Sequence, residues 1–478
     1  MSEELYFNGI DAATGKYLIP SASPDILASA IRGQPPNADE AQALKEWWIK
    51  YAETNPQKIV DMLAKEGTDY HDLSSAGWGV IFPHNADPAI VKALRPLLDW
   101  RKSQAGRRYH EYTGGDGYRF EPNGKYDSKD EWLSRHKAAP GPVDPEVVPY
   151  YLLLVGDPEQ IPYSFQTQLD VQYAVGRLHF DTPAEYWNYA NSVVSAEKKR
   201  LALGRTAAFF GVSNPDDPAT RMSAESLVKP LAAHFKQQNG WKIASATGAQ
   251  ADKPGLARLL GGQDTPALLF TASHGMGFPN GHPLQLRDQG ALLCQDWPGP
   301  KAWDGPIGRD FYFAADDLGD EANVFGLVAF FFACYGAGTP RLDDFSKQAF
   351  KQRGEIAPRN FLARLPQRML SHPNGGALAV VGHVERAWSY SFVWGQAGPQ
   401  RAVFESALQR LFDGWPIGYA FEYFNGRYAE LAAQLAFTVG EIEFGLKITP
   451  TDLAGLWTST NDARNYVVLG DPFVKLMA

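Results

Sequence analysis

Short, continuous apolar runs recur along the chain, and between them the apolar positions have helical spacing. Strands that are apolar on both sides are typical of a parallel sheet with helices packed on both faces. The alternation therefore predicts an α/β fold with a mainly parallel sheet that is covered by helices on both faces. The runs lie at residues 76–82, 150–155, 207–212, 267–272, 324–332, 376–382 and 466–469.

The same pattern divides the chain into three predicted regions. Residues 1–75 are polar with helically spaced apolar positions, which predicts a helical N-terminal region. Strand and helix signals then predict a first α/β subdomain over residues 76–203 and a second one over residues 204–478. Within the first subdomain, residues 104–147 are rich in Gly, Pro, Tyr and charge, which predicts a long excursion without regular structure.

Composition and charge narrow the classes of partner. The chain has 478 residues and a formal net charge of −9, so we expect no nucleic-acid or membrane partner. Its two cysteines, Cys294 and Cys334, exclude a disulfide framework and fit a reducing compartment. The sequence has neither a secretory signal pattern nor a long apolar span, which predicts a cytoplasmic protein. The histidines lack the spacing of a metal site, so we expect neither a metal nor another cofactor.

Two of the apolar runs end in residues that can carry chemistry. The run 267–272 is followed by Ser273-His274-Gly275, and the run 324–332 is followed by Ala333 and then Cys334. If the runs are neighbouring parallel strands, His274 and Cys334 meet at the carboxyl edge of the sheet, where open α/β sheets bind ligands. An imidazole beside a thiol is the arrangement of a cysteine nucleophile with its base. Taken singly, each residue is as readily explained by core packing.

The remaining cysteine and histidines are weaker candidates for this chemistry. Cys294 has no histidine at a comparable strand end, so we interpret it as a packing residue. His282 and His383 are less well placed as bases for Cys334, although His383 follows a predicted strand and can line a pocket. Ser273 lacks the nucleophile-elbow pattern of serine hydrolases.

Several short motifs, taken in order, carry a resemblance to a known family. Ser273-His274-Gly275 and Ala333-Cys334-Tyr335-Gly336 are similar to the His-Gly and Ala-Cys-x-Gly signatures of caspase-like (clan CD) cysteine peptidases. Leu154-Val155-Gly156-Asp157, Gly176-Arg177 and Leu469-Gly470-Asp471-Pro472 resemble segments of the gingipain-type branch, and CHAT-type proteases are the next most similar. The resemblance spans residues 75–478 and implies a two-part caspase-like region.

The resemblance also implies roles for individual residues. It makes His274 the proton acceptor and donor, Cys334 the nucleophile, and the backbone amides of Gly275 and Cys334 the oxyanion donors. In the gingipain pattern a carboxylate in the loop after the first catalytic strand orients the imidazole. Asn214 or Asp216 can take that place here, although turn chemistry explains both equally well.

Substrate preference is less well defined by the sequence. Where arginine-cleaving relatives carry an acidic residue, our alignment places Arg221, which predicts an acidic residue at the cleavage position, P1. The alternative to an acidic P1 residue is a basic one, which Asp216 or Asp217 would bind. Further candidates for the pocket wall, just past the run at 376–382, are His383, Arg386 and Trp388.

The sequence therefore supports two hypotheses from different classes. The first is an intracellular cysteine endopeptidase that acts on protein or peptide substrates and is activated by an activating protease or a regulatory protein. The second is a catalytically silent caspase-like scaffold that binds a protein partner through residues 1–145 and the aromatic-rich connection between Gly275 and Val324.

Overall fold

The computed structural model describes residues 10–16, 64–120, 126–198, 203–238, 240–343, 354–394, 397–443 and 445–477. The predicted helical region at residues 1–75 lies largely outside the described residues, which include only 10–16 and 64–75 of it. Among the described residues, the longest helices are too polar to cross a lipid bilayer.

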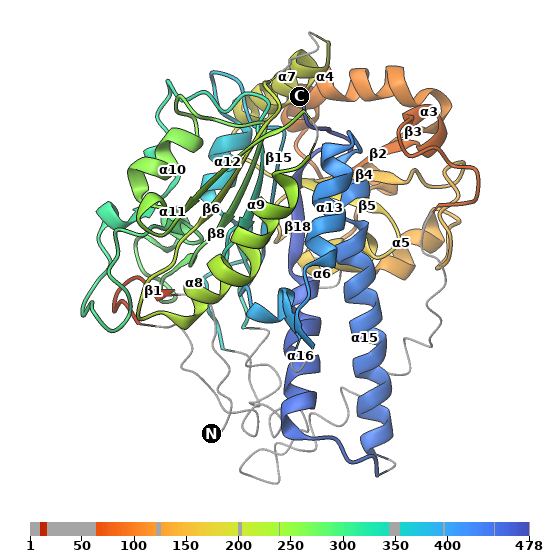
Figure 1. The fold of residues 1–478 in the computed structure, drawn as a ribbon. Coiled ribbons are helices and arrows are strands. Elements are labelled where there is room, and N and C mark those ends of the chain that lie inside the picture. Colours follow the sequence, from red (N-terminus) through yellow and green to blue (C-terminus); the bar gives the residue numbers. More distant parts are fainter. Residues whose placement is uncertain are drawn as a thin grey trace.

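A ten-stranded sheet forms the centre of the molecule (Figure 1). Its order is β3-β2-β4-β5-β18-β15-β12-β8-β6-β7, and every neighbouring pair is parallel except β15 and β18. This confirms the predicted α/β fold with a mainly parallel sheet. The strands are β2 (Trp78–Ile81), β3 (Tyr109–Tyr112), β4 (Tyr151–Val155), β5 (Ala174–Leu178), β6 (Thr206–Gly211), β7 (Lys242–Thr247), β8 (Leu268–Ala272), β12 (Val328–Phe332), β15 (Ala379–His383) and β18 (Tyr466–Gly470).

The antiparallel pair β15–β18 joins two parallel sets of strands that run in opposite directions. Strand β18 is antiparallel to β15 over five residue pairs and parallel to β5 on its other side. The carboxyl ends of β8 and β12 therefore lie at one edge of the sheet, and those of β4 and β5 lie at the opposite edge. The central strands are buried along their whole length, as their continuous apolar runs predict.

Helices flank the sheet on both faces (Figure 1). Four of them begin at a capping side chain followed within two residues by proline, a combination that favours helix initiation. Helices α15 and α16 pack together as a long hairpin with its own apolar cluster (Figure 1). The α-helices are α3 (Leu73–Ala76), α4 (Pro88–Ala105), α5 (Lys129–Arg135), α6 (Tyr163–Asp170), α7 (Pro183–Lys198), α8 (Pro218–Ser223), α9 (Lys229–Phe235), α10 (Lys253–Leu259), α11 (Gln285–Asp288), α12 (Arg364–Leu370), α13 (Ala402–Phe412), α14 (Ile417–Ala420), α15 (Glu422–Glu443) and α16 (Pro450–Arg464).

Pairs of short strands lie in the loops around the main sheet. Each pair contains only two residues per strand, so these pairs fix loop conformation and add no layer to the fold. The pairs are β1 (Ile10–Asp11) with β9 (Met276–Gly277), β10 (Leu292–Leu293) with β11 (Tyr312–Phe313), β13 (Gly338–Thr339) with β14 (Phe361–Leu362), and β16 (Val393–Trp394) with β17 (Gly398–Pro399).

The stretch predicted as an excursion without regular structure, residues 104–147, contains two regular elements. Strand β3 adds to β2 at the end of the sheet, and helix α5 begins at a capping box made by Ser128 and Glu131. Three of the four β3 residues are only half-buried, because an edge strand has a neighbour on one side only. Its sequence, Tyr-His-Glu-Tyr, therefore lacks the continuous apolar signal of the central strands.

Candidate active site

Two adjacent strands place His274 and Cys334 side by side. Ala272 at the end of β8 is in register with Phe332 at the end of β12, and the amide of Ser273 donates to the Phe332 carbonyl over 3.2 Å. His274 and Cys334 are each the second residue beyond these ends. A Cβ atom on Gly275 would lie 1.7 Å from the Cys334 carbonyl oxygen, so only glycine permits this approach of the two chains.

The imidazole of His274 is held by a carboxylate that the sequence analysis did not select for this role. The Nε2 atom of His274 lies 2.7 Å from Oδ2 of Asp217, and both side chains are buried. Asp217 caps helix α8, where its Oδ1 accepts from the Ala219 amide at 3.0 Å and its Oδ2 accepts from Thr220 Oγ1 at 2.9 Å. With the carboxylate accepting from Nε2–H, a neutral ring carries its lone pair on Nδ1.

The two residues expected to orient the imidazole make other contacts. Asn214 Nδ2 donates to the Trp297 carbonyl, and Asp216 Oδ2 accepts from the amides of Lys301 and Ala302 at 2.8 and 3.0 Å. In this structure Asp217, rather than Asn214 or Asp216, is the side chain of this loop that contacts His274. The reason is local: helix α8 starts at Asp217-Pro218, and the capping position directs the Asp217 carboxylate to the buried His274 ring.

Cys334 is fully buried, and its sulfur contacts the backbone of Ala387. The Ala387 amide lies 3.3 Å from Cys334 Sγ and donates to it. Burial raises the pKa of the Cys334 thiol to about 12, although the Ala387 amide and the charge of Arg386 oppose this rise. The thiol is therefore protonated at neutral pH in this arrangement. Tyr335, the next residue, has a positive φ of 59°, which is uncommon for a side-chain-bearing residue and turns the chain sharply directly after Cys334.

The segment 384–391, which follows β15, covers Cys334. The Tyr335 amide donates to the Glu385 carbonyl at 2.7 Å, and Ala387 contacts the sulfur. Arg386 is buried and binds both carboxylate oxygens of Asp343, at 2.8 and 3.0 Å. We call residues 384–391 the covering loop.

The structure brings some of the predicted pocket residues to this loop and leaves one apart. Arg386 and Trp388 belong to it, and His383 directly precedes it. The Trp388 amide donates to Asp462 Oδ1 at 2.8 Å, and His383 Nε2 lies 3.4 Å from the same oxygen without forming a hydrogen bond to it. Arg221 lies on α8 with an exposed side chain.

Cys294 lies apart from the paired strand ends. It follows β10, its side chain is buried, and its Sγ lies 3.4 Å from the Leu292 carbonyl oxygen. Burial raises the pKa of its thiol as well. Among the residues that the structure describes, no group of three or more His, Cys, Asp or Glu side chains is arranged to hold a metal ion.

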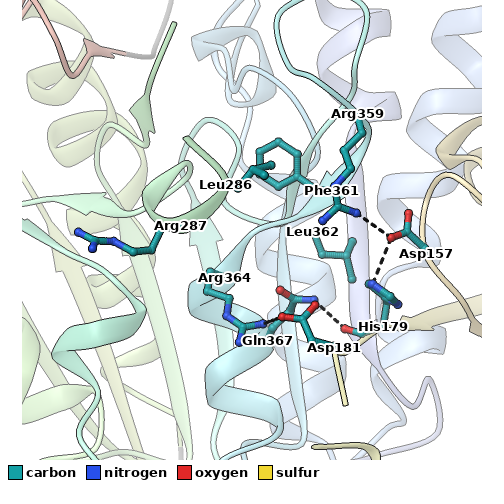
Figure 2. Close-up of a pocket in the computed structure, with 10 residues that line it drawn as sticks. All are labelled: Asp157, His179, Asp181, Leu286, Arg287, Arg359, Phe361, Leu362, Arg364 and Gln367. Atoms are coloured by element: carbon teal, nitrogen blue, oxygen red, sulfur yellow. Dashed lines mark hydrogen bonds and ion pairs between the residues drawn. The ribbon is translucent and has the colours of Figure 1, made fainter. Parts of the chain in front are cut away.

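The paired strand ends are closed to solvent in this structure. His274 is 1% exposed and Cys334 is 0% exposed. A cavity of about 270 Å³ is lined by the segments that follow β4 and β5 and by residues of the stretch 359–367, where Arg359 contacts Asp157 and Arg364 contacts Asp181 (Figure 2). Neither His274 nor Cys334 lines that cavity.

Comparisons with solved structures identify the fold. The Arg-specific cysteine proteinase gingipain R matches 87% of this chain and 80% of its own, with a TM-score of 0.51 and 13% identity. A complex of the Porphyromonas gingivalis gingipain pro- and mature domains matches with a TM-score of 0.49 and 13% identity, covering 84% of this chain and 79% of that one. The separase–securin complex of Saccharomyces cerevisiae has a TM-score of 0.30 and 10% identity, with 72% of this chain and 17% of that one covered. No family model and no curated protein matches the sequence.

The chain thus has the caspase-like fold found in cysteine peptidases of clan CD. At 13% identity this likeness concerns the fold. The chemistry that is possible at the paired strand ends depends on this chain's own residues.

Proposed function

We propose that the protein is a cysteine endopeptidase that uses Cys334 as nucleophile and His274 as its base. The observation that carries the proposal is that Cys334 and an Asp217-bound His274 each lie two residues beyond the ends of neighbouring strands that are in register. A catalytic thiol needs a base within reach, and the base needs a partner that fixes its tautomer. The bond from Asp217 to Nε2 leaves Nδ1 as the acceptor for the thiol proton.

The reaction then follows ordinary acyl transfer. The proton of Cys334 passes to Nδ1 of His274 while the sulfur bonds to the scissile carbonyl carbon. The backbone amides of Gly275 and Cys334 donate to the resulting oxyanion, an interaction for which the loss of one donor costs about 3 to 4 kcal/mol in a well-studied protease. His274 returns the proton to the leaving amine as the C–N bond breaks, and water, deprotonated by His274, hydrolyses the thioester and restores the thiol.

We further propose that the described conformation is a resting state. Burial of both side chains and the high pKa of the Cys334 thiol, about 12, support this interpretation, because a working nucleophile needs solvent access and an accessible thiolate. Movement of the covering loop by cleavage of the chain or by a regulatory protein exposes the sulfur. The ion pair between Arg386 and Asp343 links the covering loop to the segment that follows Cys334.

The preferred substrate is a peptide with an acidic P1 residue, and Arg386 is the side chain that binds it. Arg386 adjoins Ala387, which contacts the nucleophile sulfur, whereas Arg221 is exposed on α8. The guanidinium already binds a carboxylate through two hydrogen bonds, the geometry suited to an Asp or Glu side chain. Exchange of Asp343 for a substrate carboxylate would accompany opening of the covering loop.

A thiol-reactive peptide probe tests the proposal. After limited proteolysis of the native protein, we expect a probe with Asp at P1 to label the wild type and to label neither Cys334→Ala nor His274→Ala. Cys294→Ala is the matched control, since it removes the other buried cysteine, and it should be labelled normally. Arg386→Gln should abolish the preference for Asp over Gln at P1, and Arg221→Gln should preserve it.

The second candidate function is a silent scaffold that binds a protein partner. Complete burial of Cys334 favours it, because a thiol locked under the covering loop cannot meet a peptide. Labelling would be absent in the scaffold, also after limited proteolysis of the native protein. Labelling that depends on Cys334 and His274 would exclude it.

A further inference from the structure

Residues 10–16 lie against the loop that carries His274, although more than 250 positions separate them in the sequence. Ile10 pairs with Met276 and Asp11 with Gly277, directly after His274-Gly275. The Ala12 amide donates to the Gly277 carbonyl over 2.7 Å, and the Ile307 amide donates to the Ala12 carbonyl over 2.9 Å. We call residues 10–16 the N-terminal clip.

The clip ends in a turn that fits closely into the connection between the strands of the site. The Gly15 amide donates to the Asp11 carbonyl at 2.8 Å, and Gly15 has a positive φ of 70°. A Cβ atom at Gly15 would lie 2.8 Å from the Gly305 carbonyl oxygen and 2.9 Å from the Trp303 ring. Lys16 adds a surface contact, with its Nζ 3.4 Å from Asp304. The clip therefore packs against this connection and against β9.

The clip reaches the imidazole through a small apolar cluster. Ile10 is fully buried in this cluster together with Met276 and Trp297, and the cluster is separate from the main core. The Trp297 ring packs edge-on to the His274 ring, with centroids 6.3 Å apart. A continuous line of packed side chains therefore runs from the clip to the proposed base.

In this arrangement the clip supports the His274 ring and contributes little to the stability of the fold as a whole. Asp217 fixes Nε2 of His274, and Trp297 supports a second side of the same ring. Without Ile10, the apolar cluster loses one of its fully buried side chains and β9 loses its partner strand. The main core, which contains the ten-stranded sheet, shares no residue with this cluster.

We propose that the N-terminal clip is a positioning element that holds His274 in the orientation needed to take the proton from Cys334, and that displacement of the clip silences the site. The inference rests on the proposed peptidase function and deepens it. Ile10 acts through Trp297 and contacts neither the substrate nor the reacting atoms. The β-ladder between the clip and β9 contains two residue pairs, so a regulatory change in the N-terminal region can release the clip.

The test compares Ile10→Asp with the conservative Ile10→Val in the full chain. The kinetics of an irreversible peptide probe are measured as the affinity of the first complex and the rate of bond formation. We expect Ile10→Asp to lower the rate of bond formation at least tenfold with unchanged probe affinity, and Ile10→Val to retain the wild-type rate.

Structural loss is separated from loss of positioning by two further measurements. The unfolding temperature of Ile10→Asp should stay close to that of the wild type, and hydrogen exchange should accelerate at Met276 and Gly277. If Ile10→Asp does not fold, Gly15→Ala carries the same expectation, because its Cβ would meet Gly305 and Trp303 and so displace the clip without placing a charge in the apolar cluster.

The outcomes distinguish this inference from the peptidase proposal. A wild type that stays unlabelled, also after limited proteolysis of the native protein, refutes the peptidase function, and the inference falls with it. A labelled wild type with equal rates in a folded Ile10→Asp, or in Gly15→Ala, refutes the clip alone.

Discussion

Replacement of Asp217 by asparagine isolates the electrostatic role of the carboxylate that holds His274. Asparagine is as good a helix cap as aspartate, so its oxygen can still accept from the Ala219 amide and α8 should begin at the same residue. Its amide nitrogen then faces Nε2 of His274 in place of the charged Oδ2. An N–H group there favours the tautomer with hydrogen on Nδ1, and that tautomer cannot accept the thiol proton.

The magnitude follows from the bond that is lost. A buried hydrogen bond to a charged group contributes about 1.5 to 3 kcal/mol. Since about 1.4 kcal/mol corresponds to a tenfold change in rate, probe labelling of Cys334 should slow by roughly 10- to 150-fold. A complete tautomer switch would increase the loss toward the roughly 10⁴-fold effect of the equivalent change in a serine protease.

The assay is the rate of probe labelling across pH, together with equilibrium unfolding in urea. Asp217→Asn should unfold at nearly the wild-type urea concentration. Asp217→Ala removes the cap as well, so it should lose about 1 kcal/mol more in stability. Wild-type labelling by a folded Asp217→Asn protein would refute the view that this carboxylate sets the state of the imidazole.

Three further predictions concern the site and its support. Gly275→Ala should abolish labelling, measured with the same probe, because its Cβ would lie 1.7 Å from the Cys334 carbonyl oxygen and no side-chain movement relieves that clash; normal labelling would contradict the close approach. The free energy of unfolding of the wild type relative to Cys334→Ala should fall as pH rises from about 9 toward 12, by up to about 1.4 kcal/mol per pH unit. The sign follows because the folded thiol, with its pKa raised to about 12, keeps a proton that the unfolded chain releases; a pH-independent difference would refute the burial argument. Asp471→Ala should destabilise the protein by about 3 to 5 kcal/mol in urea unfolding, since Asp471 is buried and binds Arg101 Nε at 2.7 Å and Trp78 Nε1 at 3.0 Å; a loss below about 1 kcal/mol would contradict the importance of this ion pair.

The sequence predicted the central strands and the position of His274 and Cys334 beyond their ends because those features leave a local signal. A strand buried on both faces is a continuous apolar run, and such a run ends abruptly where the chain reaches the sheet edge. His274 and Cys334 are recognisable because each follows such an end by two residues. Their register across β8 and β12 then follows from the pairing of neighbouring parallel strands.

The features that the sequence did not indicate depend on contacts between distant segments. Asn214, Asp216 and Asp217 all favour turns, and only the path of the chain into α8 decides which one meets His274. One local signal was present, since Asp217 precedes Pro218 and an Asp-Pro pair often starts a helix. The contact of Ile10 with Met276 joins segments so far apart that no periodicity can relate them.

The position of β18 has a consequence for the order in which this protein can acquire its structure during synthesis. The strand lies at the centre of the sheet, between β15 and β5, yet it follows every residue of the candidate site in the sequence. A ribosome must therefore release residue 470 before the two halves of the sheet can be joined. Until then β5 and β15 each present an unpaired edge, a hazard for association between nascent chains. The sheet, and with it any proteolytic activity, is therefore complete only after almost all of the described chain has emerged from the ribosome.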